Sequence, residues 1–391
     1  MSNAIMPTYA RLPVSFTRGQ GAWLWDQNNV RYLDALSGIA VCNLGHAHPA
    51  IHQAIAEQSR LLLHTSNLYE ITLQSELANQ LTQLSGMSNA FFCNSGAEAN
   101  EAAIKLARLY GHSQGIAQPT IIVMNNSFHG RTLATLSATG NPKVHQGFTP
   151  LVDGFIHVPF NDLSAIEKVI ADNSDIVAVM AEPIQGEGGV NIPAPNYLNK
   201  VRQLCDQHKL LLILDEIQTG IGRTGRFLAY QHNDILPDIC TLAKALGNGV
   251  PIGACLATGK AAQLLTAGKH GSTFGGNLLA CRAALSVLDV IQKDNLIQAA
   301  TTQGNKIVDQ ISKRLNCHPL VAEIRHQGMM IAIELTQPCS ALTQEALDQK
   351  VLINITAEKV IRLLPPLIIS DEQITLLADT IQVLVENTRP L

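Results

Sequence analysis

The most regular feature of the chain is a series of short apolar runs between about residues 90 and 260, with amphipathic segments between them. An apolar run bounded by polar or glycine-rich segments is typical of a strand buried on both faces. Strands that alternate with helical segments indicate βαβ units, and therefore a mainly parallel sheet with helices on both faces. The runs are AFFCNSG, TIIVMNNSFHG, DIVAVMAEPIQGEGG, LLLILDEIQ, DICTLAKALG and IGACLAT.

The two ends of the chain have a different pattern. A turn-forming segment at residues 26–29 separates AWLW from VRYLDAL, which predicts a β-hairpin, and long amphipathic helices with the run GMMIAIEL follow later in the sequence. The chain has 391 residues, more than the roughly 250 to 300 that one hydrophobic core usually serves. We therefore expect a large domain at 61–280 and a smaller domain built from 1–60 and 281–391.

Composition narrows the class of partner. The formal charge is −4 and no run of lysines or arginines occurs, so we expect small-molecule partners, with no nucleic acid and no membrane. The eight cysteines include no CxxC pair, which favours a reducing compartment. No stretch approaches the ~18 apolar residues of a membrane span, and the first part of the sequence has no apolar block typical of a signal peptide. We expect a cytoplasmic protein.

Two adjacent carboxylates, Asp215 and Glu216, directly follow the aliphatic run LLLIL. In open α/β sheets ligands bind just beyond the carboxyl ends of the strands, which makes this pair a candidate site. A solvated helix N-terminus, where acidic residues are favoured, explains the pair equally well on this stretch alone.

Three further stretches carry candidate chemistry after apolar runs. Asn94, Ser95 and Gly96 precede a strong series of helix formers, so backbone N–H groups, a hydroxyl and a glycine can form a phosphate site, although a plain serine N-cap has the same pattern. Phe128 can stack on a planar ligand and Arg131 can bind a carboxylate, or the two can be ordinary core and surface residues. We expect the intervening His129 to support its loop.

Lys244 stands alone in the small, apolar and glycine-rich window TLAKALGNGVPIGACLAT. Burial disfavours the ammonium form, lowers the lysine pKa and makes a nucleophilic amine available. A surface lysine whose alkyl stem packs on apolar neighbours is the alternative. Together with the stretches above, Lys244 completes what pyridoxal 5'-phosphate needs: a Schiff-base lysine, an acid on the ring nitrogen, a ring clamp and a phosphate cup. We predict that cofactor.

Over nearly its whole length the chain resembles the class III, or ornithine-type, aminotransferases. The motifs that carry the resemblance are YLDALSGIAVCNLGHAHPAI, HTSNLYE, NSGAEANEAAIKLAR, FHGRT, EPIQGEGGV, LDEIQTGIGRTG, AKALGNGVPIGA, STFGGN and VIRLLPPLIIS. The resemblance implies the α/β aminotransferase fold type I. In this fold a large domain holds a mainly parallel seven-stranded sheet sandwiched by helices, and both chain ends form a smaller α+β domain.

The resemblance also assigns residues. The implied cofactor-binding residues are Ser95, Gly96, Ala97, Phe128, Asp215, Gln218, Lys244 and Thr273, and the implied substrate-binding residues are Arg131, Glu187, Ser272 and Arg362. Lys244 and Asp215 are the implied catalytic residues. Thr273 would reach the phosphate of the neighbouring subunit, which implies a homodimer with shared active sites. Asn248 departs from the pattern, because a glycine is common there.

The implied reaction transfers the δ-amino group of N-acetylornithine to 2-oxoglutarate, in arginine biosynthesis, and gives N-acetylglutamate 5-semialdehyde and glutamate. Ornithine, succinylornithine and 4-aminobutyrate are alternative donors within the family. From a different class, His46 and His48 have the HxH spacing that a metal hydrolase can use, although the sequence completes no metal shell around them. A cofactor-binding protein without catalysis would require a dispensable Lys244.

Overall fold

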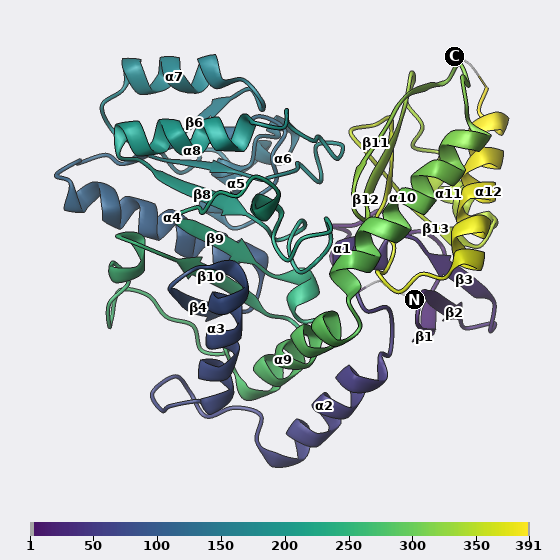
Figure 1. Ribbon diagram of the computed structural model, residues 1–391, viewed down its shortest axis with the longest axis horizontal. Helices are drawn as coiled ribbons and strands as arrows, with labels where there is room; N and C mark the ends of the chain where they lie inside the picture. The colour runs from purple at the N-terminus through teal and green to yellow at the C-terminus, as the bar shows by residue number, and fades with distance from the viewer. Residues whose placement is uncertain (1–3, 390–391) are drawn as a thin grey trace.

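A seven-stranded sheet forms the centre of the larger lobe in the computed structural model, which describes residues 4–389 (Figure 1). Its strand order is β4-β10-β9-β8-β7-β5-β6, and β10 alone runs antiparallel to its neighbours. The strands are β4 (Asn89–Cys93), β5 (Thr120–Met124), β6 (Phe155–Val158), β7 (Ile176–Ala181), β8 (Leu211–Asp215), β9 (Ile239–Leu242) and β10 (Gly253–Ala257). The predicted mainly parallel sheet is confirmed.

One strand of this sheet, β6, escaped the prediction from apolar runs. It lies at the edge of the sheet, beside β5, and only Val158 of its four residues is fully buried. An edge strand with half-buried residues lacks the continuous apolar run that marks the central strands.

Helices cover both faces of the sheet. Successive residues of a strand point to opposite faces, so Ile213 of β8 lies in the core cluster of α4, whereas Leu212 and Leu214 lie in the core cluster that includes α8. The helices of the larger lobe are α3 (Thr72–Ser85), α4 (Gly96–Ser113), α5 (Leu133–Ala138), α6 (Pro142–His145), α7 (Leu163–Asp172), α8 (Tyr197–His208), η1 (Ala229–His232), η2 (Lys244–Leu246) and η3 (Ala261–Gln263).

The two ends of the chain meet in the smaller lobe. The predicted hairpin is confirmed as β2 and β3, and β3 also pairs with β13 near the other end of the chain. One sheet contains β1 (Phe16–Gln20), β2 (Trp23–Asp26), β3 (Arg31–Asp34) and β13 (Val351–Leu352); the other contains β11 (Val321–Gln327), β12 (Met330–Leu335), β15 (Val360–Leu363) and β14 (Asn354–Thr356). The domain boundaries at residues 60 and 280 stay predictions.

Helices complete this lobe and connect it to the larger one. They are α1 (Ser37–Ala40), α2 (Pro49–Leu61), α9 (Leu278–Lys293), α10 (Leu296–Arg314), α11 (Leu342–Asp348) and α12 (Asp371–Asn387). Figure 1 shows α9 between the lobes, where it packs against α2 and α3. Among the helices of residues 4–389, none is both long enough and apolar enough to span a membrane.

Arg223, in the loop after β8, ties the two lobes together. Its guanidinium is fully buried and donates to the backbone carbonyl oxygens of Pro365, at 2.5 Å, and Met329, at 3.2 Å. It also donates to the side chains of Asn43 and Ser37, which flank Val41. The loop at the end of β8 therefore has a fixed position relative to the N-terminal segment that carries Val41.

Candidate active site

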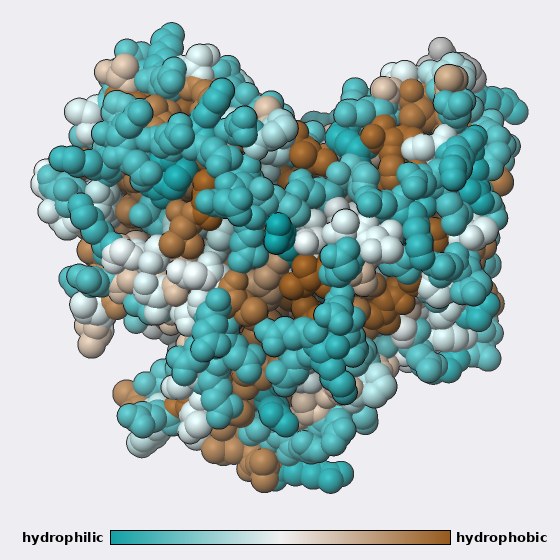
Figure 2. Space-filling view, viewed as in Figure 1, coloured by the Kyte–Doolittle hydropathy of each residue, from teal (hydrophilic) through white to brown (hydrophobic). Residues whose placement is uncertain are grey.

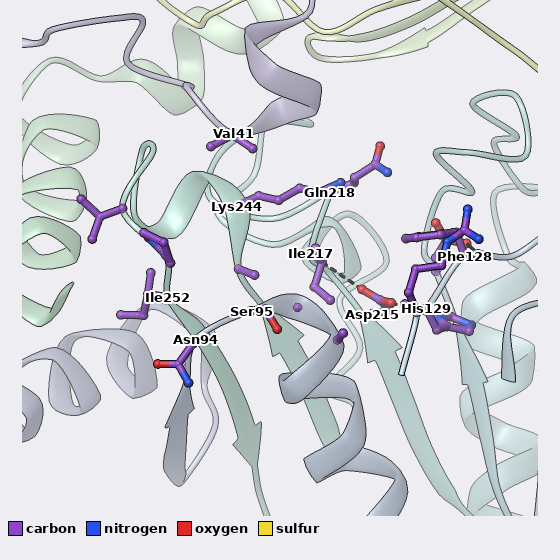
Figure 3. A pocket seen from close by; sticks show the side chains of 18 of the residues that line it. Val41, Asn94, Ser95, Phe128, His129, Asp215, Ile217, Gln218, Lys244 and Ile252 are labelled. Carbon is purple, nitrogen blue, oxygen red and sulfur yellow. Dashed lines mark hydrogen bonds and ion pairs between the residues drawn. The ribbon is translucent and has the colours of Figure 1, made fainter. Parts of the chain in front are cut away.

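A cavity of about 400 Å³ lies at the carboxyl ends of β8 and β9 (Figure 3). Of the residues that the sequence and the resemblance predict for the site, those that line the cavity are Ser95, Gly96, Ala97, Phe128, Arg131, Asp215, Gln218 and Lys244. These residues come from loops that follow different strands, so the sheet brings them together from positions far apart in the sequence.

Asp215, the last residue of β8, is buried and receives three hydrogen bonds. Its Oδ2 accepts from Asn100 Nδ2 and from His129 Nδ1, both at 2.8 Å, and its Oδ1 accepts from the backbone N–H of Ile217 at 3.1 Å. Asn100 itself is held by Thr241, which donates to its Oδ1 at 2.7 Å. A buried carboxyl group is tolerated when it is hydrogen-bonded, and these three donors give the Asp215 side chain a fixed orientation.

Glu216 points away from Asp215, because successive residues after a strand face opposite sides. It accepts hydrogen bonds from the backbone N–H groups of Ala229, at 3.0 Å, and Tyr230, at 2.9 Å. Burial raises its pKa to about 7. Residues 216–228, which directly follow β8, contain no helix, so the alternative of a solvated helix N-terminus is wrong.

Lys244 follows β9 and points its amine into the cavity (Figure 3). Within residues 4–389 the amine makes no hydrogen bond and no ion pair. Burial lowers the pKa of Lys244 to about 8, although the nearby carboxylate of Glu187 opposes the shift. The lysine is therefore not a surface residue, and a large fraction of its amine is neutral near pH 8.

The N-terminus of α4 borders the cavity opposite Lys244. Ser95 is its N-cap and accepts a hydrogen bond from the backbone N–H of Glu98 at 3.2 Å, which leaves the first N–H groups of the helix available. A Cβ atom at Gly96 would lie 2.7 Å from the side chain of Ile217. A glycine is therefore needed for this close approach, and the helix start can receive a phosphate group.

The loop after β5 contributes an aromatic ring and a cation. Phe128 is half-buried, and the exposed Arg131 guanidinium lies 5.7 Å from the centre of its ring. Glu182 holds this loop, because its carboxylate accepts from the backbone N–H of Phe128 at 3.0 Å. His129 is fully buried and bonded to Asp215, as expected for a residue that supports its loop.

Glu187, which is half-buried, and Arg362, which is fully buried, form an ion pair beside the cavity. Arg362 Nη1 donates to Glu187 Oε1 at 2.7 Å, and Gln218 Nε2 donates to the same oxygen at 3.2 Å. Burial raises the pKa of Glu187, but Arg362 outweighs this effect, and the net pKa lies below its ordinary value. The second terminal nitrogen of Arg362, Nη2, is buried and has no hydrogen-bond partner among residues 4–389.

Ser272 and Thr273 do not line the cavity. Ser272 Oγ accepts from Asn94 Nδ2 at 3.1 Å and from the backbone N–H of Gly275 at 3.0 Å, so it supports the start of α4 indirectly. Thr273 is exposed. A role for Thr273 in a neighbouring subunit stays a prediction.

Sequence reasoning missed several contributors to the site. Asn100 was named only as part of a family motif, although a fully buried asparagine on the apolar side of a helix is a signal for a polar partner. Asn248 has a φ of 45°, which explains why a glycine is common there. Its side chain bonds the backbone of Leu44 and Gly45 and so fixes the segment that carries Val41, another residue that lines the cavity.

The first histidine of the HxH motif has another partner. His46 Nε2 donates to Asp34 Oδ2 at 2.8 Å. Within residues 4–389 no group of three or more histidine, cysteine, aspartate or glutamate side chains is placed to hold a metal ion. The metal-hydrolase alternative therefore has no structural support.

Comparison with known proteins identifies the family. The chain matches the class-III aminotransferase family over residues 5–385. An acetylornithine aminotransferase from Nitrosomonas europaea is 60% identical over 363 residues, 93% of this chain and 92% of the relative. The solved acetylornithine aminotransferase from Elizabethkingia anophelis has a TM-score of 0.87 at 36% identity, covering 98% of this chain and 96% of the other. A solved ornithine aminotransferase from Toxoplasma gondii, with partial occupancy of PLP at its active site, has a TM-score of 0.94 at 34% identity, covering 98% and 92%.

This chain belongs to the class-III aminotransferases. Its cofactor is pyridoxal 5'-phosphate, and the cavity fits that group on three observations. The amine of Lys244 has no partner among the described residues, Asp215 holds a hydrogen-bonded carboxyl group at the strand end, and the start of α4 has a glycine where it borders the cavity.

We expect Asp215→Asn to lower turnover by about a hundredfold or more while the protein keeps its cofactor, because the amide cannot hold a proton on the ring nitrogen. Steady-state rates and the bound cofactor released by denaturation measure the two effects. Glu216→Gln is the matched control: it also neutralises a buried carboxylate at this strand end, but one that faces away, and it should keep both turnover and cofactor. Near wild-type turnover in Asp215→Asn would contradict this role.

The pKa of Lys244 predicts how the cofactor-free protein takes up pyridoxal phosphate. Only the neutral amine is nucleophilic, so the covalent uptake rate should rise about tenfold per pH unit below pH 8 and level off above it. Stopped-flow absorbance, with N-acetyl-lysine as the reference amine for the aldehyde's own ionisation, measures the profile. Lys244→Ala should show no covalent uptake. A rate that still climbs steeply to pH 10 would show an ordinary lysine pKa.

Proposed function

We propose that the protein is an acetylornithine aminotransferase, which transfers the δ-amino group of N-acetylornithine to 2-oxoglutarate and serves arginine biosynthesis. The products are N-acetylglutamate 5-semialdehyde and glutamate. The observation that carries the proposal is one set of side chains: the poised Lys244, the strand-end carboxyl group of Asp215, Arg131 on the wall of both cavities, and Arg362 paired with Glu187 beside them. The 60% identical relative of that name supports the choice of substrate.

Bound pyridoxal phosphate supplies an electron sink that lets an amino group leave the donor and pass to the keto acid. The N–H groups at the start of α4 would bind its phosphate, and Phe128 would cover its ring. Asp215 would hold a proton on the ring nitrogen. Lys244, with its amine free in the cavity and a pKa of about 8, would move protons at the substrate carbon as base and then as acid.

Two arginines in one site raise an orientation problem, because the donor presents one carboxylate and 2-oxoglutarate presents two. We assign the donor carboxylate to Arg131, whose guanidinium makes no ion pair within the described part of the chain. Glu187 neutralises Arg362 while the donor binds, and it moves away when the dicarboxylate arrives. A permanently fixed ion pair is the alternative, because breaking a desolvated pair costs several kcal/mol.

A homodimer with shared active sites and a cytoplasmic location complete the proposal. Large apolar side chains are exposed where the chain runs from α2 to α3, at the bottom of Figure 2, and next to Thr273. They are Leu61, Leu62, Leu63, Leu68, Tyr69 and Phe274. A patch of this kind suits a subunit interface, and Thr273 would then face the partner's site.

The substrate assignment is tested with N-acetylornithine, N-succinylornithine, ornithine and 4-aminobutyrate as donors, each with 2-oxoglutarate. We expect N-acetylornithine to give the highest kcat/KM, because the proposed donor contact at Arg131 needs only one carboxylate and the α-nitrogen of this donor is uncharged. Glutamate formation measures each rate under identical conditions. A higher kcat/KM for ornithine or 4-aminobutyrate would reject the proposed substrate and leave the family unchanged.

Glu187→Ala should slow the half-reaction with N-acetylornithine by about tenfold or more relative to the half-reaction with 2-oxoglutarate, because it leaves Arg362 permanently free to capture the donor carboxylate. The same change should improve glutamate as a donor. Single-turnover absorbance measurements separate the two half-reactions, and Glu187→Gln provides the conservative comparison. An equal loss in both halves would support the fixed ion pair instead.

A further inference from the structure

A second cavity, of about 450 Å³, adjoins the cavity that contains Lys244. Phe128 and Arg131 line both cavities, so the two cavities are neighbours that share these side chains. The second cavity lies between the larger lobe, which contributes α6, and the smaller lobe, which contributes the turn between β14 and β15. A donor with its amine near Lys244 and its carboxylate at Arg131 would place the group on its α-nitrogen here.

An ion pair joins the two sides of the second cavity. Lys143 Nζ, on α6, lies 2.6 Å from Glu358 Oε1, on the turn between β14 and β15. The backbone N–H of Lys143 donates to Asn141 Oδ1 at 3.0 Å. This hydrogen bond caps α6 and fixes the backbone position of Lys143. The two residues are 215 positions apart, so only the packing of one lobe on the other brings them together.

The turn that carries Glu358 is held in an unfavourable backbone conformation. Ala357 and Glu358 have φ angles of 47° and 65°, in the left-handed region that non-glycine residues rarely adopt. Thr356, the residue before the turn, ties it to the larger lobe, because its hydroxyl donates to the backbone carbonyl of Glu187. Such conformations persist where the surrounding structure over-determines them, and they cluster at functional sites.

Both carboxylates that line the second cavity are paired with a cation, but one of its cations has no carboxylate partner among the residues that the structure describes. Glu187 is paired with Arg362 and Glu358 is paired with Lys143, whereas Arg131 makes no ion pair within residues 4–389. The cavity thus offers a free cation for one carboxylate and no free carboxylate for an ammonium group. The lysine holds the pKa of Glu358 below its ordinary value, so this carboxylate is charged and would attract an ammonium group if it were unpaired.

We propose that the Lys143–Glu358 ion pair sets donor specificity, because it neutralises the carboxylate that would otherwise bind a free α-ammonium group. The second cavity then favours an acylated, uncharged α-nitrogen, and Val144, Ile355 and Ala357 offer apolar surface to the acyl group. This inference rests on the proposed function, since it explains how that site separates N-acetylornithine from ornithine.

The test is the ratio of kcat/KM for ornithine to kcat/KM for N-acetylornithine in variants that keep side-chain shape. Lys143→Met frees Glu358 and should raise the ratio; Glu358→Gln frees Lys143 and should lower it. The side chains are 76% and 68% exposed, so each shift should be about three- to fivefold. The double variant should return close to the wild-type ratio.

Binding gives the same comparison without turnover. L-Norvaline and N-acetyl-L-norvaline lack the δ-amine, so their dissociation constants report only on recognition of the α-nitrogen. We expect Lys143→Met to strengthen norvaline binding relative to N-acetylnorvaline, and Glu358→Gln to weaken it by the same factor.

Lys306→Met is the matched control, because Lys306 forms an exposed ion pair with Asp371, at 2.7 Å, between α10 and α12. It should leave both ratios unchanged. Ratios that stay constant in Lys143→Met and Glu358→Gln, or that move in the same direction in both, would overturn the role of the pair. A wild-type enzyme that does not use N-acetylornithine would instead reject the proposed function, so the two failures are distinguishable.

Discussion

The buried carboxylate of Asp215 is the constraint on which the site depends. A charge removed from water at the end of a buried strand is tolerated only with several donors, and Asp215 has Asn100, His129 and the N–H of Ile217. Asn100 belongs to α4, His129 follows β5 and Ile217 follows β8. Satisfying one carboxylate therefore fixes the relative positions of the phosphate cup, the aromatic loop and the strand end.

The central sheet was predictable because its inner strands are buried on both faces, and such strands carry continuous apolar runs. The pattern fails where this physical cause is absent. The edge strand β6 is half-buried and lacks the run. The antiparallel direction of β10 leaves no mark in its residues, since GACLA is as apolar as the parallel strands of the sheet. Strand direction follows from the length and path of the connections, which periodicity does not record.

The site was predictable from residues whose chemistry contrasts with their surroundings. Lys244 in a glycine-rich apolar window and Asp215 after an aliphatic run are local signals, and the cavity contains both. Glu187 and Arg362 are 175 positions apart, so only resemblance to a family named them as site residues, and only the structure shows their contact. Glu182 acts through the loop that it holds, and no local pattern marks a residue of that kind.

The ion pairs Glu187–Arg362, the inner pair, and Lys143–Glu358, the outer pair, differ in exposure to water. This difference in exposure sets how strongly the charges of each pair interact. Arg362 is fully buried and Glu187 is 34% exposed, whereas Lys143 and Glu358 are mostly exposed. Charges interact more strongly where water is excluded, so rearranging the inner pair requires a ligand that replaces the lost partner with its own carboxylate. The outer pair is weaker and screened by water, so it acts by cancelling a charge rather than by moving. The two roles are therefore compatible in one site. The Glu187–Arg362 pair responds to the second carboxylate of 2-oxoglutarate, and the Lys143–Glu358 pair stays intact near the α-nitrogen.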